Sequence, residues 1–541
     1  MDEKGSTYPR RILKNKVFLY LTEFFAGMSV MAVELGASRL LAPYFSSSQI
    51  VWTIIIGTIM IAMALGNLYG GKKADRNPNP DKLYGRIIIA GIWIGLIPVV
   101  GKYIIIGISA LLVFAVNSNF LVIAGFAACM VLFVFPLFLL GTVTPSLVKY
   151  TMDSLDDSAS IVGKLNASNT IGSIIGTFVP TFISIPAVGT NITFLVFAGI
   201  LLALCAVYFI TSKISIKKIK KLPVSIVIFI LCCAFGSNSS FAFWQSDLIY
   251  EDESVYNYLQ VYEQGNKTIL STNVLFGVQS VYMKEKGITG LFYDYALPSC
   301  LMAGIKETDN FDILILGNGA GTFATQIQRY FTGTNIEGVE IDEKITNLAR
   351  KYFDMSDDVK VTTYDGRAYL NSIDKKYDLI MVDAYQDITI PFQMSSVEFF
   401  TLVKNHLKED GVMLVNMNMK ASGENNINDY LADTIAAVFP TVYMIDVQNT
   451  TNREVFAFCN PDIKERMILN AMTEDGELLP FSGYVAERLI TYVPGDRIMT
   501  DDKAPVELLG MKAIDDIIST EVKSFKEIYD KEGFKGLIKY L

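Results

Sequence analysis

The chain has 541 residues, of which 51% are apolar, and its mean hydropathy is +0.36. That composition is too hydrophobic for an ordinary soluble enzyme, and the length predicts two or three domains. The apolar residues crowd into the first 240 positions and charged residues follow them, so we expect a membrane half and a globular half. The net charge is −9 without a long polybasic tract, which argues against nucleic-acid binding and is compatible with a cationic substrate.

Metal-ligating residues are few in this sequence. The six cysteines have neither the spacing of a zinc site nor that of a disulfide framework. The single histidine, His406, stands in KNHLKEDG at the expected end of a helix, where we assign it a structural role. The sequence therefore predicts a protein that uses no metal.

Seven apolar segments fill the first half of the chain, and most of them are long enough to cross a bilayer. They lie at about 17–43, 50–71, 85–117, 120–146, 165–187, 190–211 and 223–240. Lys4, Arg10 and Arg11 precede the first segment, and such a basic flank should stay in the cytoplasm. We therefore predict an all-α, multi-span transmembrane domain over residues 1–240, in contact with the lipid of the cell membrane.

The number of crossings decides on which side the globular half lies. Segment 85–117 contains Pro98 and forms either one helix or two short ones, while the basic connections 70–76 and 213–221 should both be cytoplasmic. If segment 85–117 crosses once, both basic connections lie in the cytoplasm. A crossing by segment 223–240 would then place the globular half outside, where nucleotide cofactors are scarce. We expect a cytoplasmic catalytic domain. This requires either that segment 85–117 forms two spans or that segment 223–240 lies in the membrane interface instead of crossing the bilayer.

The globular half begins with alternating residues after Trp244, which predict a small antiparallel β subdomain over 247–300 with a turn at Gly265-Asn266. From Phe311 onward, apolar runs alternate with helical patterns. The runs lie at 313–316, 336–339, 359–362, 378–382, 411–416, 441–446 and 454–458. This pattern predicts a seven-stranded Rossmann-like α/β sheet of the S-adenosylmethionine-dependent methyltransferase type over 301–520, followed by a helical tail at 521–541.

A glycine turn stands at the start of that sheet, in FDILILGNGAGTFATQIQRYFTGTNIEGVEID. An apolar strand runs into Gly317, Gly319 and Gly321, a helix follows, and the next strand ends on Glu340. Glycines permit backbone torsions and a close approach that a Cβ would block, and the acid accepts hydrogen bonds from two ribose hydroxyls. Strand, turn, helix and acid in this order predict a nucleoside site.

Three acids stand at the ends of successive predicted strands. They are Glu340, Asp365, which precedes Gly366 in YDGRAYL, and Asp383 in YDLIMVDAYQD. Ligands of open α/β sheets bind at this edge, so Glu340 would hold the ribose, Asp365 the adenine amino group, and Asp383 a charged sulfonium or amine. Any one of them is also explained as a helix cap or turn residue.

Residues 247–460 resemble the aminopropyltransferase family, the spermidine synthases of polyamine biosynthesis. The whole chain is similar to bacterial membrane proteins that fuse a multi-span, transporter-like half to such a domain. The resemblance rests on VMAVELGASRLLAPYFSSSQIVWT, ALGNLYGGKKADR, PLFLLGTVTPSL and LNASNTIGSIIG in the first half, and on GNGAGT, GVEID, YDGRAYL, YDLIMVDAYQDITIPFQMSSVEFF and IMTDDKAPVE in the second.

This resemblance implies that decarboxylated S-adenosylmethionine binds at the glycine turn and that a neutral amine, such as a polyamine, displaces methylthioadenosine without a metal. It assigns the ribose to Glu340 and the adenine to Asp365. It also implies that Gln279 and Asn257 line the nucleoside and its tail. Tyr293 matches a substrate-gating tyrosine, with Tyr295 as the alternative alignment.

Two positions depart from the family pattern. Ala320 replaces an aspartate that binds the aminopropyl ammonium, and Gln386 replaces the catalytic aspartate, with Asp387 one residue later. Fewer carboxylates weaken the binding of a polycation and remove a reason to exclude ordinary S-adenosylmethionine. The acid/base candidates are therefore Asp383, Tyr385, Asp387 and Tyr293.

Three hypotheses follow. The first is a membrane-bound aminopropyltransferase-like enzyme that acts on S-adenosylmethionine or its decarboxylated form and releases methylthioadenosine. The second, favoured by Ala320 and Gln386, is methyl transfer or internal cleavage of S-adenosylmethionine in the same fold. The third is a transporter or sensor regulated by a nucleoside-binding domain, which Glu34 and Arg39 in the first span would support if they form a polar pocket rather than a helix-end anchor. The acceptor amine and a homo-oligomeric state stay open.

Overall fold

The computed structural model describes residues 15–45, 48–113, 119–151, 158–212, 221–238, 240–245, 247–274, 278–307, 310–384, 390–418, 423, 425–473 and 476–540. The chain divides into two compact units. The first comprises Met1–Val116, Phe120–Ser246 and Asp252–Tyr258, and the second comprises Asn117–Asn119, Asp247–Glu251 and Leu259–Leu541.

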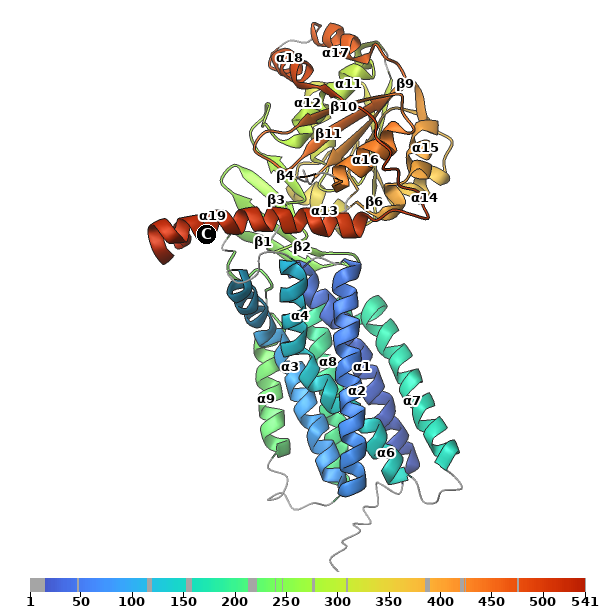
Figure 1. The fold of residues 1–541 in the computed structure, drawn as a ribbon, viewed down its shortest axis with the longest axis vertical. Coiled ribbons are helices and arrows are strands. Elements are labelled where there is room, and N and C mark those ends of the chain that lie inside the picture. Colours follow the sequence, from blue (N-terminus) through green and yellow to red (C-terminus); the bar gives the residue numbers. More distant parts are fainter. Residues whose placement is uncertain are drawn as a thin grey trace, which may run out of the picture. The chain divides into compact units, whose positions relative to one another are not determined.

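The first unit is a helix bundle over its described residues (Figure 1). Its helices are α1 (Lys16–Phe45), α2 (Gln49–Arg76), α3 (Pro80–Val113), α4 (Phe120–Leu132), α5 (Val134–Gly141), α6 (Val143–Thr151), α7 (Ser158–Val179), the π-helix η2 (Pro180–Ser184), α8 (Ile185–Thr211) and α9 (Lys221–Gly236). Five helical stretches in the described part are long and apolar enough to cross a membrane, namely Lys16–Phe45, Gln49–Arg76, Pro80–Leu112, Val134–Thr151 and Ser158–Thr211. Phe120–Leu132 and Leu222–Gly236 are shorter apolar helices.

Two details of the bundle bear on the predicted spans. The segment that contains Pro98 is a single helix, α3, rather than two short ones. The last of the five stretches is interrupted at Gly189, a residue inside α8 whose φ of 79° is not helical. The bundle also packs closely, because a Cβ on Gly172 or Gly176 of α7 would collide with main-chain atoms of α1.

The second unit opens with a small antiparallel sheet in the order β1-β2-β3-β4, formed by the described strands β1 (Leu248–Glu253), β2 (Tyr258–Gln264), β3 (Lys267–Ser271) and β4 (Ser280–Met283). Residues 252–258 of β1, β2 and their connection cluster with the first unit. The alternating pattern predicted the last three strands, and β2 and β3 join at Gly265-Asn266 as expected. The first strand, LIYEDE, was not predicted because three of its last four residues are acidic, a composition that disfavours strands.

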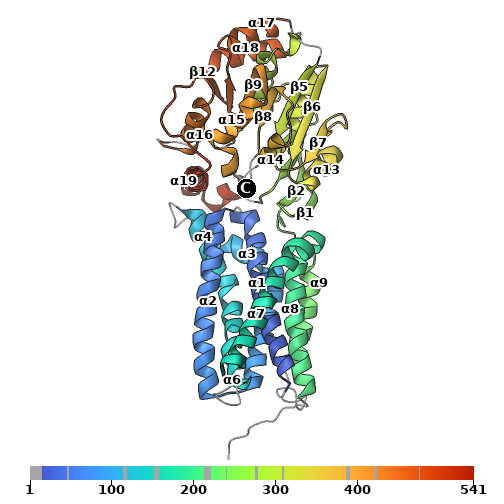
Figure 2. The same cartoon turned by 90° about the vertical axis from the view of Figure 1, so that its right-hand side faces the viewer.

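The main sheet has the strand order β12-β10-β11-β9-β8-β5-β6-β7 within the described residues (Figure 2). Its strands are β5 (Phe311–Leu316), β6 (Thr334–Glu340), β7 (Lys360–Thr363), β8 (Tyr377–Val382), β9 (Leu407–Met417), β10 (Thr441–Asp446), β11 (Arg453–Phe458) and β12 (Ile490–Thr491). The ladders among β5 to β9 are parallel, whereas β11 pairs antiparallel with both β9 and β10. The seven predicted apolar runs are confirmed as β5 to β11, and the two-residue edge strand β12 is an addition.

Helices pack on both faces of this sheet. The helices of the second unit, within its described residues, are α10 (Phe292–Ala296), α11 (Pro298–Met302), α12 (Thr322–Tyr330), α13 (Glu343–Tyr352), α14 (Gly366–Asn371), α15 (Val397–Asn405), α16 (Ile427–Ala436), α17 (Ile463–Ala471), α18 (Leu478–Arg488) and α19 (Val506–Tyr540), with the 3₁₀ turns η4 (Ile305–Glu307) and η5 (Phe392–Met394). The central strands β5 and β8 are covered on both faces, which explains why FDILIL and YDLIMV are apolar runs rather than alternating patterns.

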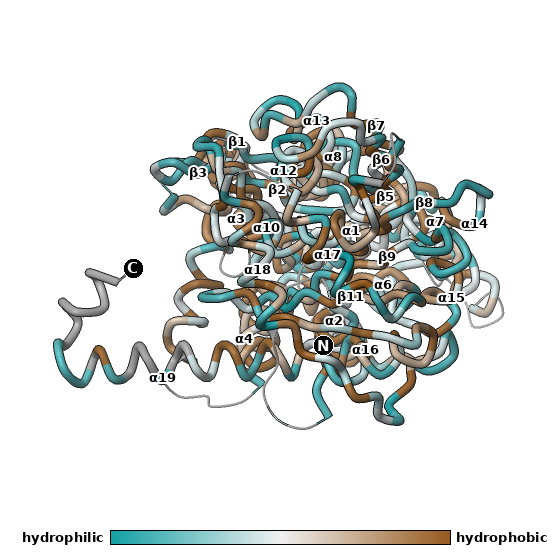
Figure 3. The backbone as a smooth tube through the Cα atoms, turned by 90° about the horizontal axis from the view of Figure 1, so that it is seen from above, coloured by the Kyte–Doolittle hydropathy of each residue, from teal (hydrophilic) through white to brown (hydrophobic). Residues whose placement is uncertain are grey.

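The end of the chain is the long helix α19, which begins at Val506, before the predicted tail at 521. Figure 3 shows polar and apolar stretches in turn along its described part. His406 lies at the end of α15, with its two ring nitrogens 2.9 Å from the carbonyl oxygens of Leu402 and Ile373. Both contacts are with the main chain, as expected of a structural histidine.

Candidate functional site

The glycine turn connects β5 to α12 through three residues with positive φ. The φ angles are 85° at Gly317, 51° at Gly319 and 71° at Gly321. At Gly317 the need for glycine is also steric, because a Cβ would lie 2.4 Å from the carbonyl oxygen of Asp383. The turn therefore lets the main chain of β5 pass directly against the end of β8.

Glu340, the last residue of β6, closes the other side of the turn. Its carboxylate accepts hydrogen bonds from the N–H groups of Gly319 at 2.9 Å and Asp342 at 3.1 Å. Burial nevertheless raises the pKa of Glu340 to about 7, because desolvation outweighs those two bonds. The sequence placed this acid beside the turn, and the structure holds it there as an acceptor with 7% of its surface exposed.

The register of the sheet sets several polar residues in one row. Glu454 of β11 is the partner of Asn416 of β9. The ladders joining β9 to β8, β8 to β5 and β5 to β6 end one residue before Asn416, Asp383, Gly317 and Glu340. Because side chains two residues apart share a face, this row continues the face occupied by the main core cluster. The row thus crosses the sheet at the carboxyl ends of its parallel strands, where ligands of such sheets bind.

Asp383 stands in the middle of this row, directly after β8. Its Oδ1 accepts a hydrogen bond from the side-chain amide of Asn416 at 2.9 Å. The surrounding protein raises the pKa of Asp383 to about 7 by desolvation, and the charge of Glu340 adds to the rise while Asn416 opposes it. An acid with this pKa is a competent general base near neutral pH.

Sequence reasoning missed Asn416 and one acid of the row, Glu454. It is fully buried, and neither carboxyl oxygen has a hydrogen-bond partner among the described residues. Burial raises its pKa well above the ordinary value, and Asp383 contributes to the rise. The available signal was a single acid at the start of an apolar strand, REVFAF, which is hard to recognise because β11 runs antiparallel and begins, rather than ends, at this edge.

Asp365 and Gly366 lie beyond Glu340 along the same edge. Asp365 caps α14, and its Oδ1 accepts a hydrogen bond from the N–H of Ala368 at 2.8 Å. Gly366 is the first residue of that helix. The neighbouring strand β7 ends at Thr363, which pairs with Glu340, so Asp365 follows within two residues of the site. Its assignment to the adenine stays a prediction.

Gln279 and Asn257 come from the small sheet and its surroundings. Gln279 is half-buried and precedes Ser280, whose hydroxyl accepts a hydrogen bond from the N–H of Ala320 at 3.3 Å. Ser280 therefore contacts the glycine turn and was not singled out in the sequence, although FGVQS contains it. Asn257 ends a turn closed by Ser254 in the first unit, so its predicted role is untested.

Of the remaining candidates, the structure describes the two tyrosines of α10 but neither Tyr385 nor Asp387. Tyr293 of α10 is buried in the core of the second unit, and burial raises the pKa of its hydroxyl. Tyr295, the alternative, approaches Tyr484 with its hydroxyl. Tyr385 and Asp387 lie outside the described residues, so their roles are predictions.

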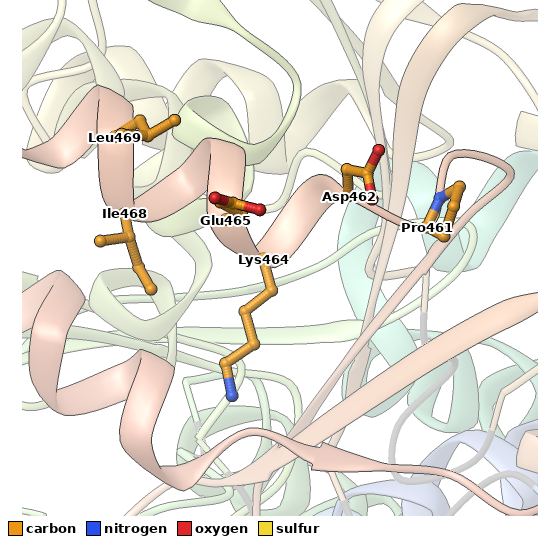
Figure 4. Close-up of a pocket in the computed structure, with 6 residues that line it drawn as sticks. All are labelled: Pro461, Asp462, Lys464, Glu465, Ile468 and Leu469. Carbon is orange, nitrogen blue, oxygen red and sulfur yellow. The ribbon is translucent and has the colours of Figure 1, made fainter.

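A surface hollow elsewhere in this unit does not belong to the row. It surrounds the start of α17 and is lined by Pro461, Asp462, Lys464, Glu465, Ile468 and Leu469 (Figure 4). These residues follow the end of β11, whereas Glu454 lies near the beginning of that strand. The hollow is therefore at the opposite edge of the sheet.

The strand order, the glycine turn and the acids at the carboxyl edge are typical of the α/β class of nucleoside-dependent transferases. Residues 300–454 match the spermine/spermidine synthase domain. The "Probable polyamine aminopropyl transferase" of Bifidobacterium longum is 49% identical over 351 residues, which are 62% of this chain and 77% of that protein. The chain therefore belongs to the polyamine aminopropyltransferase, or spermidine synthase, family.

Other matches are more distant or cover less of the chain. The polyamine aminopropyltransferase of Vibrio vulnificus is 24% identical over 303 residues, covering 53% of this chain and 98% of the relative. Spermidine synthase from Thermotoga maritima, a crystal structure, is 17% identical over 43% of this chain and 79% of its own, with a TM-score of 0.35.

Proposed function

We propose that the protein is a membrane-bound aminopropyltransferase that uses decarboxylated S-adenosylmethionine and an amine, and that releases methylthioadenosine. The observation that carries this proposal is the position of Asp383, one residue beyond β8, against the glycine turn and hydrogen-bonded to Asn416. A base at this point lies beside the turn that would hold the nucleoside, which is where an attacking amine must lose its proton.

The residues fit the donor. The glycine turn brings main-chain N–H groups to the edge of the sheet. Glu340 can accept hydrogen bonds from the ribose hydroxyls in place of the bond that it now accepts from the N–H of Gly319. The acids of the row, Asp383 and Glu454, favour a cationic tail. They would repel the carboxylate of ordinary S-adenosylmethionine, which supports the decarboxylated donor despite Ala320.

The reaction balances with these groups. The amine nitrogen forms a bond to the terminal propyl carbon of the sulfonium, and the carbon–sulfur bond breaks with its electron pair going to sulfur. The sulfonium thereby becomes the neutral thioether of methylthioadenosine, and the proton lost by the amine passes to the carboxylate of Asp383. Alignment of nitrogen, carbon and sulfur supplies a large part of the acceleration. Tyr293, Tyr385 and Asp387 remain candidates for a second proton-transfer group.

The enzyme would be anchored by its apolar half as a multi-pass protein of the cell membrane. Five described helical stretches have the length and apolarity of membrane spans, which supports contact with lipid. A transporter or sensor role for this half is the alternative. Glu23, buried in α1 and bonded to Thr144 at 2.5 Å and Asn169 at 2.8 Å, is the observation that favours it.

One assay distinguishes the chemical alternatives. The full chain, purified in detergent, is given decarboxylated or ordinary S-adenosylmethionine, with and without putrescine. We expect methylthioadenosine only with the decarboxylated donor and an amine, and we expect D383N to abolish it. Adenosylhomocysteine would identify methyl transfer, whereas methylthioadenosine without an amine would identify internal cleavage. Binding of a donor without turnover would favour the regulatory alternative.

A further inference from the structure

Glu23 is an acid inside the apolar half of the chain. It lies in α1, about 10 Å along the helix axis from Lys16, and its side chain is fully buried. Helix α1 is one of the five described stretches that have the length and apolarity of a membrane span. Ionisable side chains in such a span are costly, and they commonly line a path or a site for an ion or a substrate.

The described residues satisfy only one oxygen of the Glu23 carboxyl. Its Oε1 accepts hydrogen bonds from the hydroxyl of Thr144 at 2.5 Å and from the side-chain amide of Asn169 at 2.8 Å. Its Oε2 is buried and has no hydrogen-bond partner among the described residues. An ionised carboxyl would lack a donor there, and a carboxyl protonated at Oε2 would lack an acceptor, so both states carry a cost. A ligand at Oε2 would remove it.

The two donors to Glu23 are neutral groups. The guanidinium of Arg86 in α3 is half-buried, but it donates to the hydroxyl of Ser146 in α6 at 3.3 Å instead. An ionised Glu23 would therefore keep an uncompensated charge in the bundle, which is strongly unfavourable. A bound cation would compensate that charge.

The side chains around Glu23 suit a hard metal cation. The hydroxyl of Ser173 lies 3.5 Å from the amide oxygen of Asn169, so Glu23, Thr144, Asn169 and Ser173 form one connected set, the Glu23 cluster. Its members come from α1, α6 and α7, which contact one another (Figure 1). Carboxylate, hydroxyl and amide oxygens are ligands that hard cations prefer. The cluster contains one carboxylate, so a monovalent cation neutralises it, whereas a divalent cation would leave a positive charge in apolar surroundings.

Close packing of α1 on α7 holds the cluster together. A Cβ on Gly27, one turn after Glu23, would lie 2.6 Å from the carbonyl oxygen of Asn169 and 3.0 Å from the hydroxyl oxygen of Ser173. The missing side chain lets the main chain of α7 approach α1, as small residues do between membrane helices. This approach brings the polar side chains of α7 to the carboxyl of Glu23.

We propose that the Glu23 cluster is a binding site for a monovalent alkali cation, with the cation in contact with Oε2 of Glu23. Entry of the cation into a protonated site releases the proton, so the carboxylate is paired with one positive charge in either case. The cluster lies in the first unit, whereas the carboxyl edge of the main sheet lies in the second, and its occupancy does not depend on the reaction proposed there. The membrane half would thereby have an ion-dependent role of its own.

The stability of the helix bundle in sodium tests this site. The three tryptophans, Trp52, Trp93 and Trp244, lie in the first unit, so tryptophan fluorescence follows unfolding of the bundle within the full chain. The full chain, purified in detergent, is heated in sodium chloride or in an equal concentration of N-methylglucamine chloride, whose cation is too large for the cluster. Sodium at about a hundredfold excess over its dissociation constant should raise the midpoint of unfolding by roughly 5 °C or more, because it binds only the folded state.

Three variants separate binding at Glu23 from a general effect of salt. E23Q keeps the shape of the side chain without its charge and should abolish the rise in sodium. E34Q makes the same change at a half-buried acid of the same helix, and as the matched control it should retain the rise. S173A leaves both hydrogen bonds of Glu23 in place and removes one oxygen of the cluster, so about tenfold more sodium should be needed for the same rise. S173A also tests the site if E23Q does not fold.

Several results would overturn this assignment. They are equal midpoints of wild type in the two salts, a rise that persists in E23Q, and an unchanged sodium dependence in S173A. Stabilisation of wild type by a lower pH, without any response to sodium, would assign a proton to Glu23 and would also refute the cation site. The proposed function is tested separately by methylthioadenosine formation, since an inactive protein with an intact sodium response would contradict that function alone.

Discussion

Asp383 is expected to weaken the fold while it serves catalysis, and D383N measures both effects. An unfolded aspartate titrates at about 3.9, whereas burial raises the pKa of Asp383 to about 7. Because the folded state then holds its proton over a range in which the unfolded state has lost it, stability is highest below pH 4. It falls as the pH rises towards 7.

The size of the effect follows from the shift. About three pH units correspond to about 4 kcal/mol when the acid is fully ionised, and the partial exposure of Asp383 reduces this to roughly 2 kcal/mol. Asparagine keeps the acceptor for Asn416 but carries no charge, so D383N should avoid this penalty. For a unit of this size we expect a midpoint of thermal unfolding higher by roughly 4–8 °C at pH 8.

The assay is thermal unfolding of wild type and D383N in detergent at pH 5 and pH 8, beside methylthioadenosine formation. At pH 5 the unfolded state has already lost the proton that folded Asp383 keeps, so a difference between the two unfolding temperatures should be present but clearly smaller than at pH 8. Activity of wild type should rise with pH through about 7, the value to which burial raises the pKa of Asp383, and D383N should be inactive throughout. A stability difference that is the same at both pH values would refute the reasoning, as would an active D383N.

Three further substitutions test residues at and near the carboxyl edge of the sheet. G317A introduces a Cβ 2.4 Å from the carbonyl oxygen of Asp383, so calorimetry should show lost binding of methylthioadenosine, and retained affinity would contradict the role of the turn. E340Q removes a charged hydrogen-bond acceptor. Kinetics should show a KM for the donor that is about tenfold higher or more, with the KM for the amine unchanged. A change in the KM for the amine alone would argue against binding of the ribose by Glu340. R367A removes a bidentate pair with Asp501 (2.7 and 2.6 Å) that ties IMTDD to α14, so limited proteolysis should cut there faster, and equal rates would show that the pair contributes little.

The sequence predicted those parts of the fold in which one physical cause dominates. Strands buried on both faces must be apolar throughout, so β5 and β8 were recognisable without knowledge of their neighbours. The two-residue strand β12 forms only by pairing with the edge strand β10. No local sequence pattern predicts such a pairing.

The candidate site likewise contains residues that the sequence pattern predicts and residues that it does not. Glu340 and Asp383 follow or end parallel strands, and that position alone made them candidates for the site. Glu454 joins them through an antiparallel strand whose register with Asn416 depends on the return of the chain after β10. Sequence spacing does not reveal that register, which is why Glu454 was not among the predicted candidates.

Restoring the family aspartate at position 320 tests whether the acids of the row have taken over its function. Ala320 is fully buried in a cluster with Leu259, Val261 and Phe353, and these apolar neighbours would desolvate a new carboxylate. An uncompensated buried charge costs about 3–5 kcal/mol, so A320D should lower the midpoint of unfolding strongly, whereas A320S should change it little. We expect no gain in the KM for decarboxylated S-adenosylmethionine, because Asp383 and Glu454 already provide the negative charge. A stable A320D with tighter donor binding would show instead that the site lacks an acid, and would return the choice of donor to ordinary S-adenosylmethionine.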